Sequence, residues 1–191
     1  SYLDLLIGLK TDLCDDPTKG KSIISYRQEV RTIQPGHEAR WSLPPDGWVK
    51  INSDESFHDR AAGAGMVLQD DKGAIIFSAC RVLFSCRDAL EAELSACMEG
   101  LSLSIQRSEL PVAIEMDSMV AVKLIQSQDL DRSIYYATVK EIKHLMSLRR
   151  TCITLVNHTQ NKVSDSLAKF ARLEGRTMTW IGWEPLRPVW M

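Results

Sequence analysis

Hydrophobic and polar positions begin to follow a regular pattern at Trp48, and this pattern predicts a sheet. Residues alternate over Trp48–Ser53, with Val49 and Ile51 on one face, which indicates a half-buried strand. Gly63–Gln69 and Ala74–Leu83 are read as two further strands, separated by a turn over 70–73. We therefore expect an antiparallel meander of three strands.

Downstream of the meander, helical and strand patterns take turns. Asp88, followed three residues later by Glu91, fits a capping box that opens a helix reaching about Ile105. The remaining predicted elements are the strands Val112–Met116 and Cys152–Val156 and the helices Met119–Gln126, Ile134–Leu148 and Val163–Leu173. Helices that follow strands suggest crossover connections, so the order βββαβααβα predicts an α/β fold with a mixed sheet covered on both faces.

The two ends of the chain lack this regularity. Residues 1–33 show one short helical pattern, Leu3–Leu9, and residues 34–47 are punctuated by prolines and glycines like a linker. The last 15 residues hold three of the five tryptophans, which we expect to pack on the domain or on a partner rather than to stack on bases. The predicted organisation is a flanking segment and linker (1–46), one domain (47–175) and a Trp-rich tail (176–191).

The composition excludes several classes of protein. The 191 residues are 45% hydrophobic and 25% charged, unlike a disordered chain, a collagen or a coiled coil. Apolar runs stay far below the roughly 20 residues that span a bilayer, so no membrane partner is expected. Five scattered cysteines without a CxxC pair favour a reducing compartment, nuclear or cytoplasmic. The first residue is Ser1 rather than Met, which fits a fragment or a processed chain.

The net charge of −2 hides an asymmetry along the sequence. Residues 47–131 carry 7 basic and 14 acidic side chains, a net of −7, whereas residues 138–176 carry 8 basic and 3 acidic ones, a net of +5. One reading is two solvated faces of opposite sign. The other is an acidic centre that holds cations beside a basic surface that holds phosphates.

Two aspartates directly follow predicted strands. Asp54 comes after the strand that ends at Ser53, and Asp117 after the strand that ends at Met116. Because ligands bind at the carboxyl ends of parallel strands, near the point where strand order reverses, these two residues are a candidate site. The alternative is that each aspartate only ends its strand as a turn residue.

Two more carboxylates lie on predicted helices. Glu93 has Leu90 and Ala96 as helical neighbours, so it points with the apolar stripe toward the sheet. A buried carboxylate costs several kcal/mol and either neutralises or finds a cation or an arginine. Asp165 lies in the first turns of the last helix, where the helix dipole alone would favour it. A carboxylate cluster with no matching histidine or cysteine set selects Mg²⁺ or Mn²⁺ over zinc.

Five short motifs stand in a fixed order between Trp41 and about Gly175. They are Trp41-Ser-Leu-Pro-Pro-Asp-Gly-Trp48-Val-Lys-Ile-Asn52-Ser-Asp54, Ala62-Gly-Ala-Gly65, Ala92-Glu93-Leu-Ser-Ala96-Cys-Met-Glu-Gly100-Leu101, Ile114-Glu-Met-Asp117-Ser118 and Val156-Asn-His158-Thr-Gln-Asn161-Lys-Val-Ser-Asp165-Ser-Leu167-Ala168. With them in register, this part of the chain resembles type 1 ribonuclease H domains, specifically the plant RNase H-like domains related to non-LTR retrotransposons. The resemblance implies a five-stranded mixed sheet, three antiparallel strands and then parallel ones, with helices on both faces.

The resemblance also implies a mechanism, cleavage of the RNA strand of an RNA–DNA hybrid by two Mg²⁺ ions, with Mn²⁺ as an alternative. The 2′-hydroxyl would distinguish the RNA strand. The implied catalytic and metal-ligating residues are Asp54, Glu93, Asp117 and Asp165. The implied contacts to nucleic acid are Asn52, Ser56, Ser118, His158, Asn161 and Lys162. The expected partner is an RNA–DNA hybrid or another nucleic acid, and the expected oligomeric state is a monomer.

Departures from the family pattern leave alternatives open. Glu55 stands where the family carries glycine, and it adds a negative charge beside the expected phosphate path. The family's catalytic histidine position is occupied by Leu155. His158 lies three residues later and could contact phosphate or aid product release, or be a loop histidine without a catalytic role. No well-developed group of basic residues, the family's basic handle, follows the second helix, and the basic residues of 140–150 would have to serve in its place. A catalytically weak domain that only binds nucleic acid, or a module that binds a protein partner, are therefore the competing functions.

Overall fold

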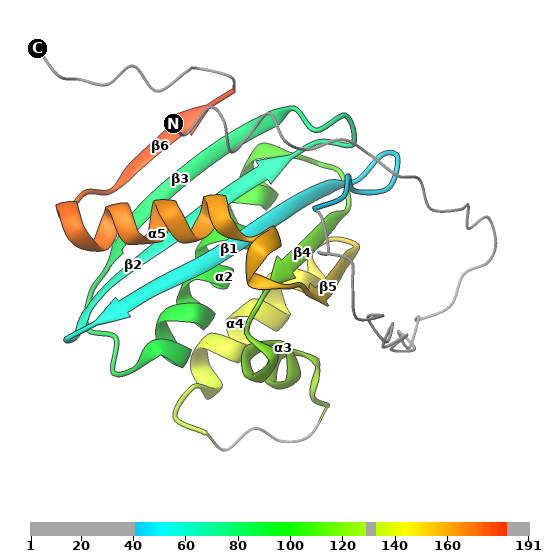
Figure 1. Cartoon of the computed structure of the whole chain (residues 1–191). Coiled ribbons are helices and arrows are strands. Elements are labelled where there is room, and N and C mark those ends of the chain that lie inside the picture. Colours follow the sequence, from blue (N-terminus) through cyan, green and yellow to red (C-terminus); the bar gives the residue numbers. More distant parts are fainter. Residues whose placement is uncertain (1–40, 129–132, 183–191) are drawn as a thin grey trace, which may run out of the picture.

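The computed structural model describes residues 41–128 and 133–182, and these form one sheet with helices on both faces (Figure 1). The strands are β1 (Val49–His58), β2 (Ala61–Gln69), β3 (Ile75–Leu83), β4 (Val112–Met116), β5 (Thr151–Leu155) and β6 (Met178–Ile181). The helices are α2 (Ala89–Arg107), α3 (Met119–Gln126), α4 (Tyr136–Ser147), the 3₁₀ turn η1 (His158–Gln160) and α5 (Lys162–Glu174). The leucine pattern near the N-terminus, the linker up to residue 40, Trp183 and Trp190 lie outside the described residues.

The sheet has the order β5-β4-β1-β2-β3-β6 and mixes both pairing modes. β1, β2, β3 and β6 pair antiparallel, while β4 pairs parallel with both β1 and β5. This confirms the predicted α/β fold class, an RNase H-like sheet in which antiparallel strands are followed by parallel ones. The direction of the sheet changes at β1, which is antiparallel to β2 on one side and parallel to β4 on the other.

The sheet contains six strands, so the predicted five-strand sheet is wrong by one. The extra strand is β6, which lies in the segment expected to be an irregular tail and pairs Phe77 with Ile181 at one end and Cys80 with Met178 at the other. Its Trp180 packs beside Val67 and Leu167, in a cluster between the sheet and α5. The tryptophan was expected to pack on the domain, and it does so as part of a strand.

The first strand is also longer than predicted. The sequence suggested an end at Ser53, but β1 continues to His58 because its antiparallel pairing with β2 runs as far as His58↔Ala61. The polar residues that follow Ser53 broke the alternation. Asp54 therefore lies inside a strand rather than at its end, and the interpretation of this residue as a turn residue is wrong.

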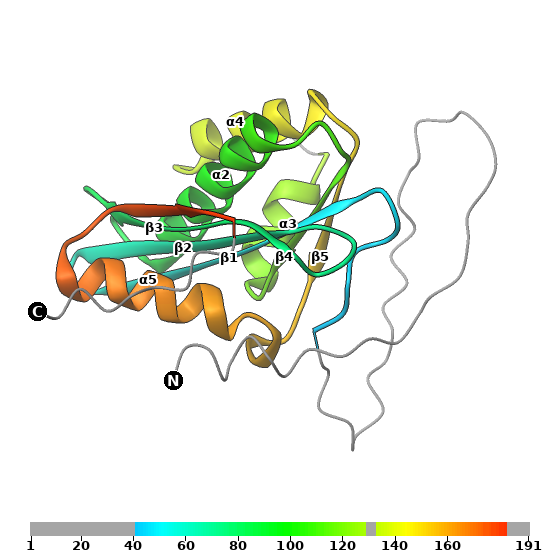
Figure 2. The same ribbon diagram turned by 90° about the horizontal axis from the view of Figure 1, so that it is seen from above.

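Helices α2 and α4 cover one face of the sheet, and α5 lies across the other (Figure 2). The larger core lies on the α2 side, where Ile51, Leu94 and Ile114 are almost fully buried. None of the helices in the described ranges is both long and apolar enough to cross a membrane.

Residues ahead of β1 are tied to the sheet by a buried polar network. The Lys50 ammonium lies 2.6 Å from the Glu115 carboxylate, and the Asn52 amide donates to the same carboxylate at 2.9 Å. Trp41 donates its indole N–H to the Asn52 side-chain oxygen at 2.9 Å, and its ring lies 5.0 Å from the Lys50 ammonium. The division of the chain into 1–46, 47–175 and 176–191 stays a prediction, and Trp41 packs on the sheet from the first of these segments.

Two glycines of β2 allow α5 to lie unusually close to the sheet. A Cβ added at Gly65 would meet the backbone N of Ala168 at 2.5 Å and come closer still to the Ser164 carbonyl oxygen. A Cβ added at Gly63 would lie 2.7 Å from the backbone N of Arg172. Both obstacles are helix backbone, which cannot move aside without shifting the whole helix.

We expect Gly65→Ala to push α5 away from β2 and to lower the free energy of unfolding by about 1–3 kcal/mol, the usual range for overpacking in a core. Urea unfolding of the two proteins measures the change. Gly100→Ala is the matched control, because its added methyl would meet the side chains of Met66 and Ile51 at 3.2 and 3.3 Å rather than backbone. An equal effect of the two substitutions would contradict the special role of the β2 glycines.

Candidate active site

The first pair of acidic residues meets where β1 runs on beyond β4. The parallel pairing between these strands ends at Asn52↔Glu115, so the edge of β1 is open from Ser53 onward. Asp54 lies on this open stretch, and Asp117 follows the last residue of β4. One oxygen of Asp54 accepts the Glu55 backbone N–H at 2.9 Å. The expected meeting of these two aspartates follows from the shortness of β4 and not from two strand ends.

The third acid, Asp165, is carried to the site by α5. Two side chains of this helix region bond directly to the backbone of β1. The Asn161 amide donates to the Ser53 carbonyl oxygen at 2.8 Å, and the Ser164 hydroxyl donates to the Asn52 carbonyl oxygen at 3.1 Å. These bonds fix the start of α5 against the two residues that precede Asp54. The Asp165 carboxylate itself lies 2.6 Å from the Lys169 ammonium one turn later.

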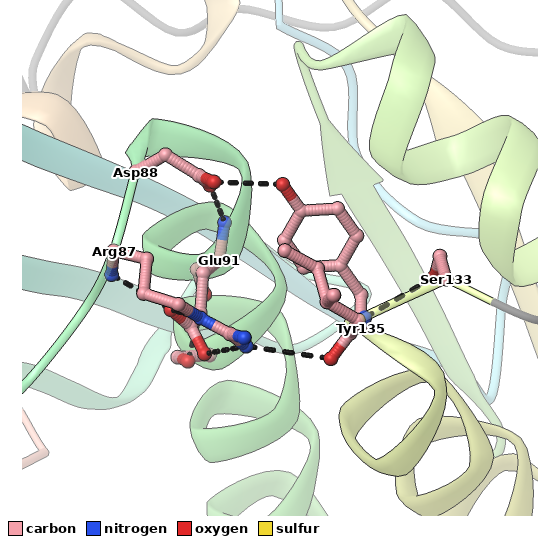
Figure 3. A network of polar contacts seen from close by, with 7 residues as sticks. Arg87, Asp88, Glu91, Ser133 and Tyr135 are labelled. Carbon is pink, nitrogen blue, oxygen red and sulfur yellow. Dashed lines mark hydrogen bonds and ion pairs between the residues drawn. The ribbon is translucent and has the colours of Figure 1, made fainter.

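The fourth acid, Glu93, comes from the opposite face on α2. It is only 3% exposed. The start of α2 is fixed by a network of polar contacts (Figure 3), in which Asp88 accepts the Glu91 backbone N–H at 2.9 Å and the Tyr135 hydroxyl at 2.7 Å. The Glu91 carboxylate bonds to the backbone N–H of Arg87, not to that of Asp88, and so closes the predicted capping box one residue early. The network positions the turn of α2 that carries Glu93.

His158 faces the acidic group from the 3₁₀ turn ahead of α5. Its Nδ1 lies 2.9 Å from an Asp117 carboxylate oxygen, and its Nε2 lies 4.0 Å from an Asp165 oxygen. The hydrogen bond with Asp117, and then the charges of Asp165 and Asp117, raise the pKa of this imidazole above its ordinary value. One ligand atom each of Asp54, Asp117 and His158 lie within 4.8 Å of one another, a spacing that suits a metal ion.

Burial and mutual repulsion make these carboxylates hard to ionise. Burial first, and then the charge of Asp117, raise the pKa of Asp54 to about 8. Burial first, and then the charges of Asp54 and Asp117, raise the pKa of Glu93 to about 9. Glu55 belongs to the same group, since burial followed by the charges of Asp117 and Asp165 raises its pKa. A divalent cation would offset this repulsion.

The donor set fits a hard divalent cation. One oxygen of Asp54 and one of Glu93 are buried and have no hydrogen-bond partner among the described residues. Buried acceptors without partners are rare in folded proteins, and bare carboxylate oxygens are the ligands that such cations prefer. The acidic cluster is therefore suited to hold a divalent metal ion.

The residues predicted to contact nucleic acid differ in burial and in their contacts within the protein. Asn52 and Asn161 are buried, and their amide groups bond within the protein as described above. The Ser56 hydroxyl accepts the Arg172 guanidinium N–H at 2.8 Å, and the Ser118 hydroxyl caps α3 by accepting the Ala121 N–H at 3.3 Å. Lys162 is exposed at the start of α5. These roles, like those of the four acids, remain predictions.

Two cations close to the site were missed from sequence. Lys169 pairs with Asp165, and Arg172 reaches Ser56 from the same helix. The i,i+4 spacing of Asp165 and Lys169 was a readable signal for the first pair. No sequence rule links Arg172 to Ser56, because the contact joins two elements 116 positions apart.

The basic residues of 140–150, which were expected to serve as the family's basic handle, make contacts with nearby residues of the protein. Lys143 donates to the Ser127 carbonyl oxygen at 2.6 Å, and Arg149 pairs with Glu109 at 3.1 Å. Lys140 lies 5.7 Å from the ring centroid of Tyr136, and Arg150 lies over the ring of Trp48. Next to the acidic group, the cations that make contacts are Lys169 and Arg172 of α5.

Comparisons with known proteins agree with this fold. A family model described as reverse transcriptase-like matches residues 52–171. No curated protein matches the chain. Among solved structures, RNase H1 from the archaeon Halobacterium salinarum NRC-1 is similar, with a TM-score of 0.62 and 21% identity, over 68% of this chain and 100% of that one.

Two further structures show the same likeness. The N-terminal RNase H domain of Rv2228c from Mycobacterium tuberculosis has a TM-score of 0.61 and 19% identity, over 68% of this chain and 96% of that one. LC11-RNase H1 in complex with an RNA/DNA hybrid has a TM-score of 0.59 and 19% identity, over 66% of this chain and 98% of that one. At these identities the likeness concerns the fold.

The raised pKa values predict how stability depends on pH in the absence of metal. The carboxyls of Asp54 and Glu93 bind protons more tightly in the folded protein than in the unfolded chain, where their values are near 3.8 and 4.5. The free energy of unfolding should therefore fall as the pH rises from about 4 to about 9. Urea unfolding in EDTA at several pH values measures this slope.

The double substitution Asp54→Asn and Glu93→Gln should make the free energy of unfolding depend less on pH. The two carboxyls that bind protons more tightly in the folded protein are then absent. Asp46→Asn, on an exposed residue ahead of β1, is the control and should leave the slope unchanged. A stability that rises with pH across this range in the unsubstituted protein would contradict the burial of uncompensated carboxyls.

Proposed function

The chain belongs to the reverse transcriptase-like family, and from this premise we propose that it is a divalent-metal-dependent endonuclease that cleaves the RNA strand of an RNA–DNA hybrid. The observation that carries the proposal is that Asp54 and Asp117 lie together at the open edge of β1, close enough to Glu93 for their charges to raise its pKa. Two of these three acids hold buried oxygens without partners among the described residues. The type 1 RNase H folds to which the chain is similar support the same reading.

Asp54, Glu93, Asp117 and Asp165 are proposed to hold Mg²⁺. When bound, such ions supply an activated water and stabilise the leaving oxygen of a phosphodiester. The protein's own contribution is to hold four carboxylates in fixed places before the cation arrives. The β1 backbone holds Asp54, the α5 contacts hold Asp165, and the capped start of α2 holds Glu93.

The proposed path of the hybrid runs along the open edge of β1. Ser56 and Ser118 flank the acidic group along the chain, and His158 and Lys162 stand exposed beside it. Arg172, on the same face as Asp165, adds a cation beside Ser56. Phosphate contacts of this kind fix the position of a nucleic acid, whereas the 2′-hydroxyl identifies the RNA strand.

The direct test is cleavage of a labelled RNA–DNA hybrid with and without Mg²⁺. RNA–RNA and DNA–DNA duplexes of the same sequence are the controls. Cleavage confined to the RNA strand of the hybrid and abolished by EDTA is the expected result. Binding of the hybrid without any cleavage in Mg²⁺ or Mn²⁺ would favour a catalytically silent domain.

We expect Asp117→Asn to abolish cleavage and to leave the fold intact, since it removes a ligating charge and keeps the size of the side chain. Without metal, the free energy of unfolding should stay level or rise, because Asp117 raises the pKa of both Asp54 and Glu93. Cleavage assays and urea unfolding in EDTA measure the two effects. Asp46→Asn should cleave like the unsubstituted protein.

The negative charge of Glu55 beside the acidic group favours a catalytically weak enzyme. Its half-buried carboxyl accepts the Phe57 backbone N–H, and its charge acts on Glu93. The carboxylate therefore adds its charge to the acidic group from a half-buried position. A fixed negative charge at this place repels phosphate and adds to the crowding of carboxylates.

Glu55→Gln should therefore strengthen binding of the hybrid, and Glu55→Gly should strengthen it further by removing bulk. The gain should be larger at about 50 mM than at about 200 mM salt, since ions screen the repulsion. Fluorescence anisotropy in Ca²⁺, which suppresses turnover, measures binding. Weaker binding or lower cleavage in both variants would instead mean that Glu55 orients a metal-bound water.

A further inference from the structure

The metal-binding group contains a nitrogen donor that the four-carboxylate reading does not use. His158 Nδ1 lies 2.9 Å from an Asp117 oxygen, and it belongs to the set of three ligand atoms that includes Asp54. The imidazole is 61% exposed, so no packing holds it against Asp117. Its hydrogen bond with Asp117 holds the ring over the acidic group and places Nδ1 where a cation would lie.

The spacing between His158 and Asp117 matches two adjacent ligands on one octahedral ion. Ligand atoms about 2.1 Å from such an ion are about 3.0 Å apart when adjacent and about 4.2 Å apart when opposite. The separation of 2.9 Å between Nδ1 and the Asp117 oxygen fits an adjacent pair. All three atoms lie within 4.8 Å of one another, a limit slightly above the opposite-pair separation, so the third donor is near an octahedral position rather than at it.

The second ring nitrogen faces a carboxylate, at a distance that allows electrostatic attraction but no hydrogen bond. Metal-binding histidines direct the nitrogen that does not ligate toward a carboxylate or a carbonyl, which fixes the ring orientation. Here Nε2 faces an Asp165 oxygen at 4.0 Å, and that carboxylate is itself held by Lys169 at 2.6 Å. Asp165 is therefore suited to orient the imidazole as well as to lie beside the ions.

A separate observation shows that the third donor is available. Asp54 is 5% exposed, and one of its carboxylate oxygens is buried without a hydrogen-bond partner among the described residues. The other oxygen already accepts the Glu55 N–H. A carboxylate buried in this way either binds a proton or takes a cationic partner, and Lys169 and Arg172 are paired with Asp165 and Ser56 instead.

We propose that His158 is a direct ligand, through Nδ1, of the divalent ion held by Asp54 and Asp117, and that it shifts the site's preference from Mg²⁺ toward Mn²⁺. Mg²⁺ takes oxygen ligands and dehydrates reluctantly, whereas imidazole suits first-row transition ions. Mn²⁺ combines tolerance of carboxylate oxygen with acceptance of nitrogen. The inference rests on the proposed function, because it names a ligand and the metal of that same site.

The test is pulsed electron paramagnetic resonance of Mn²⁺ added to the full chain without nucleic acid, at pH 8. A histidine ligand gives a nitrogen coupling, and incorporation of ¹⁵N-histidine must change its frequency. We expect this coupling in the unsubstituted protein, its loss in His158→Gln and its retention in His144→Gln, an exposed histidine on α4. Circular dichroism checks that each variant is folded.

Titration calorimetry gives the selectivity. His158→Gln should weaken Mn²⁺ binding about tenfold and Mg²⁺ binding less than about threefold, because only the transition ion gains much from nitrogen. Bound Mn²⁺ without a nitrogen coupling, or equal losses for both ions, would overturn the ligand role and leave the proposed function standing. No binding of Mn²⁺ at millimolar concentration would overturn both.

Discussion

The close contact between α5 and β2 is the constraint on which the acidic site depends. Gly63 and Gly65 leave the helix backbone within van der Waals reach of the strand, with no side chain between them. At this distance, the side chains of Asn161 and Ser164 reach backbone carbonyl oxygens of β1, the strand next to β2. A helix set back by the width of one methyl group could not make these bonds, and Asp165 would then lie away from Asp54.

The same site carries an electrostatic cost that the fold alone does not relieve. Asp54 lies on the stretch of β1 that β4 leaves unpaired, and Glu93 comes from α2 on one face of the sheet. Their burial, and the charge of nearby Asp117, drive both pKa values far above the ordinary range. Such an arrangement lowers stability without a cation, and it also provides a strong attraction for one. Binding capacity and local instability thus have one cause.

Much of the fold could be predicted from the sequence, and the misses have physical reasons. The helix of Glu93 and the turn over 70–73 follow local rules of periodicity and capping, and both are where the pattern put them. The end of β1 was misplaced because alternation treats polar residues as solvent-facing, whereas Asp54 and Ser56 face a site inside the protein. β6 was missed because four residues bearing one tryptophan carry little strand signal until β3 offers an edge to pair with.

The roles of the four acids and of His158 stay predictions, but the sequence gives far more local information about the acids than about the histidine. The acids stand beside strands and on an apolar helix stripe, so each has a local signature. His158 has none, because its place is set by how β5 connects to α5 through a single 3₁₀ turn. The result is a site with two unlike halves. Asp54 and Glu93 are buried at 5% and 3% exposure, and a strand and a capped helix determine where a cation can lie. His158 and the salt-bridged Asp165 form the outer half, and in the proposed site the chemistry of their donors would determine which cation is preferred.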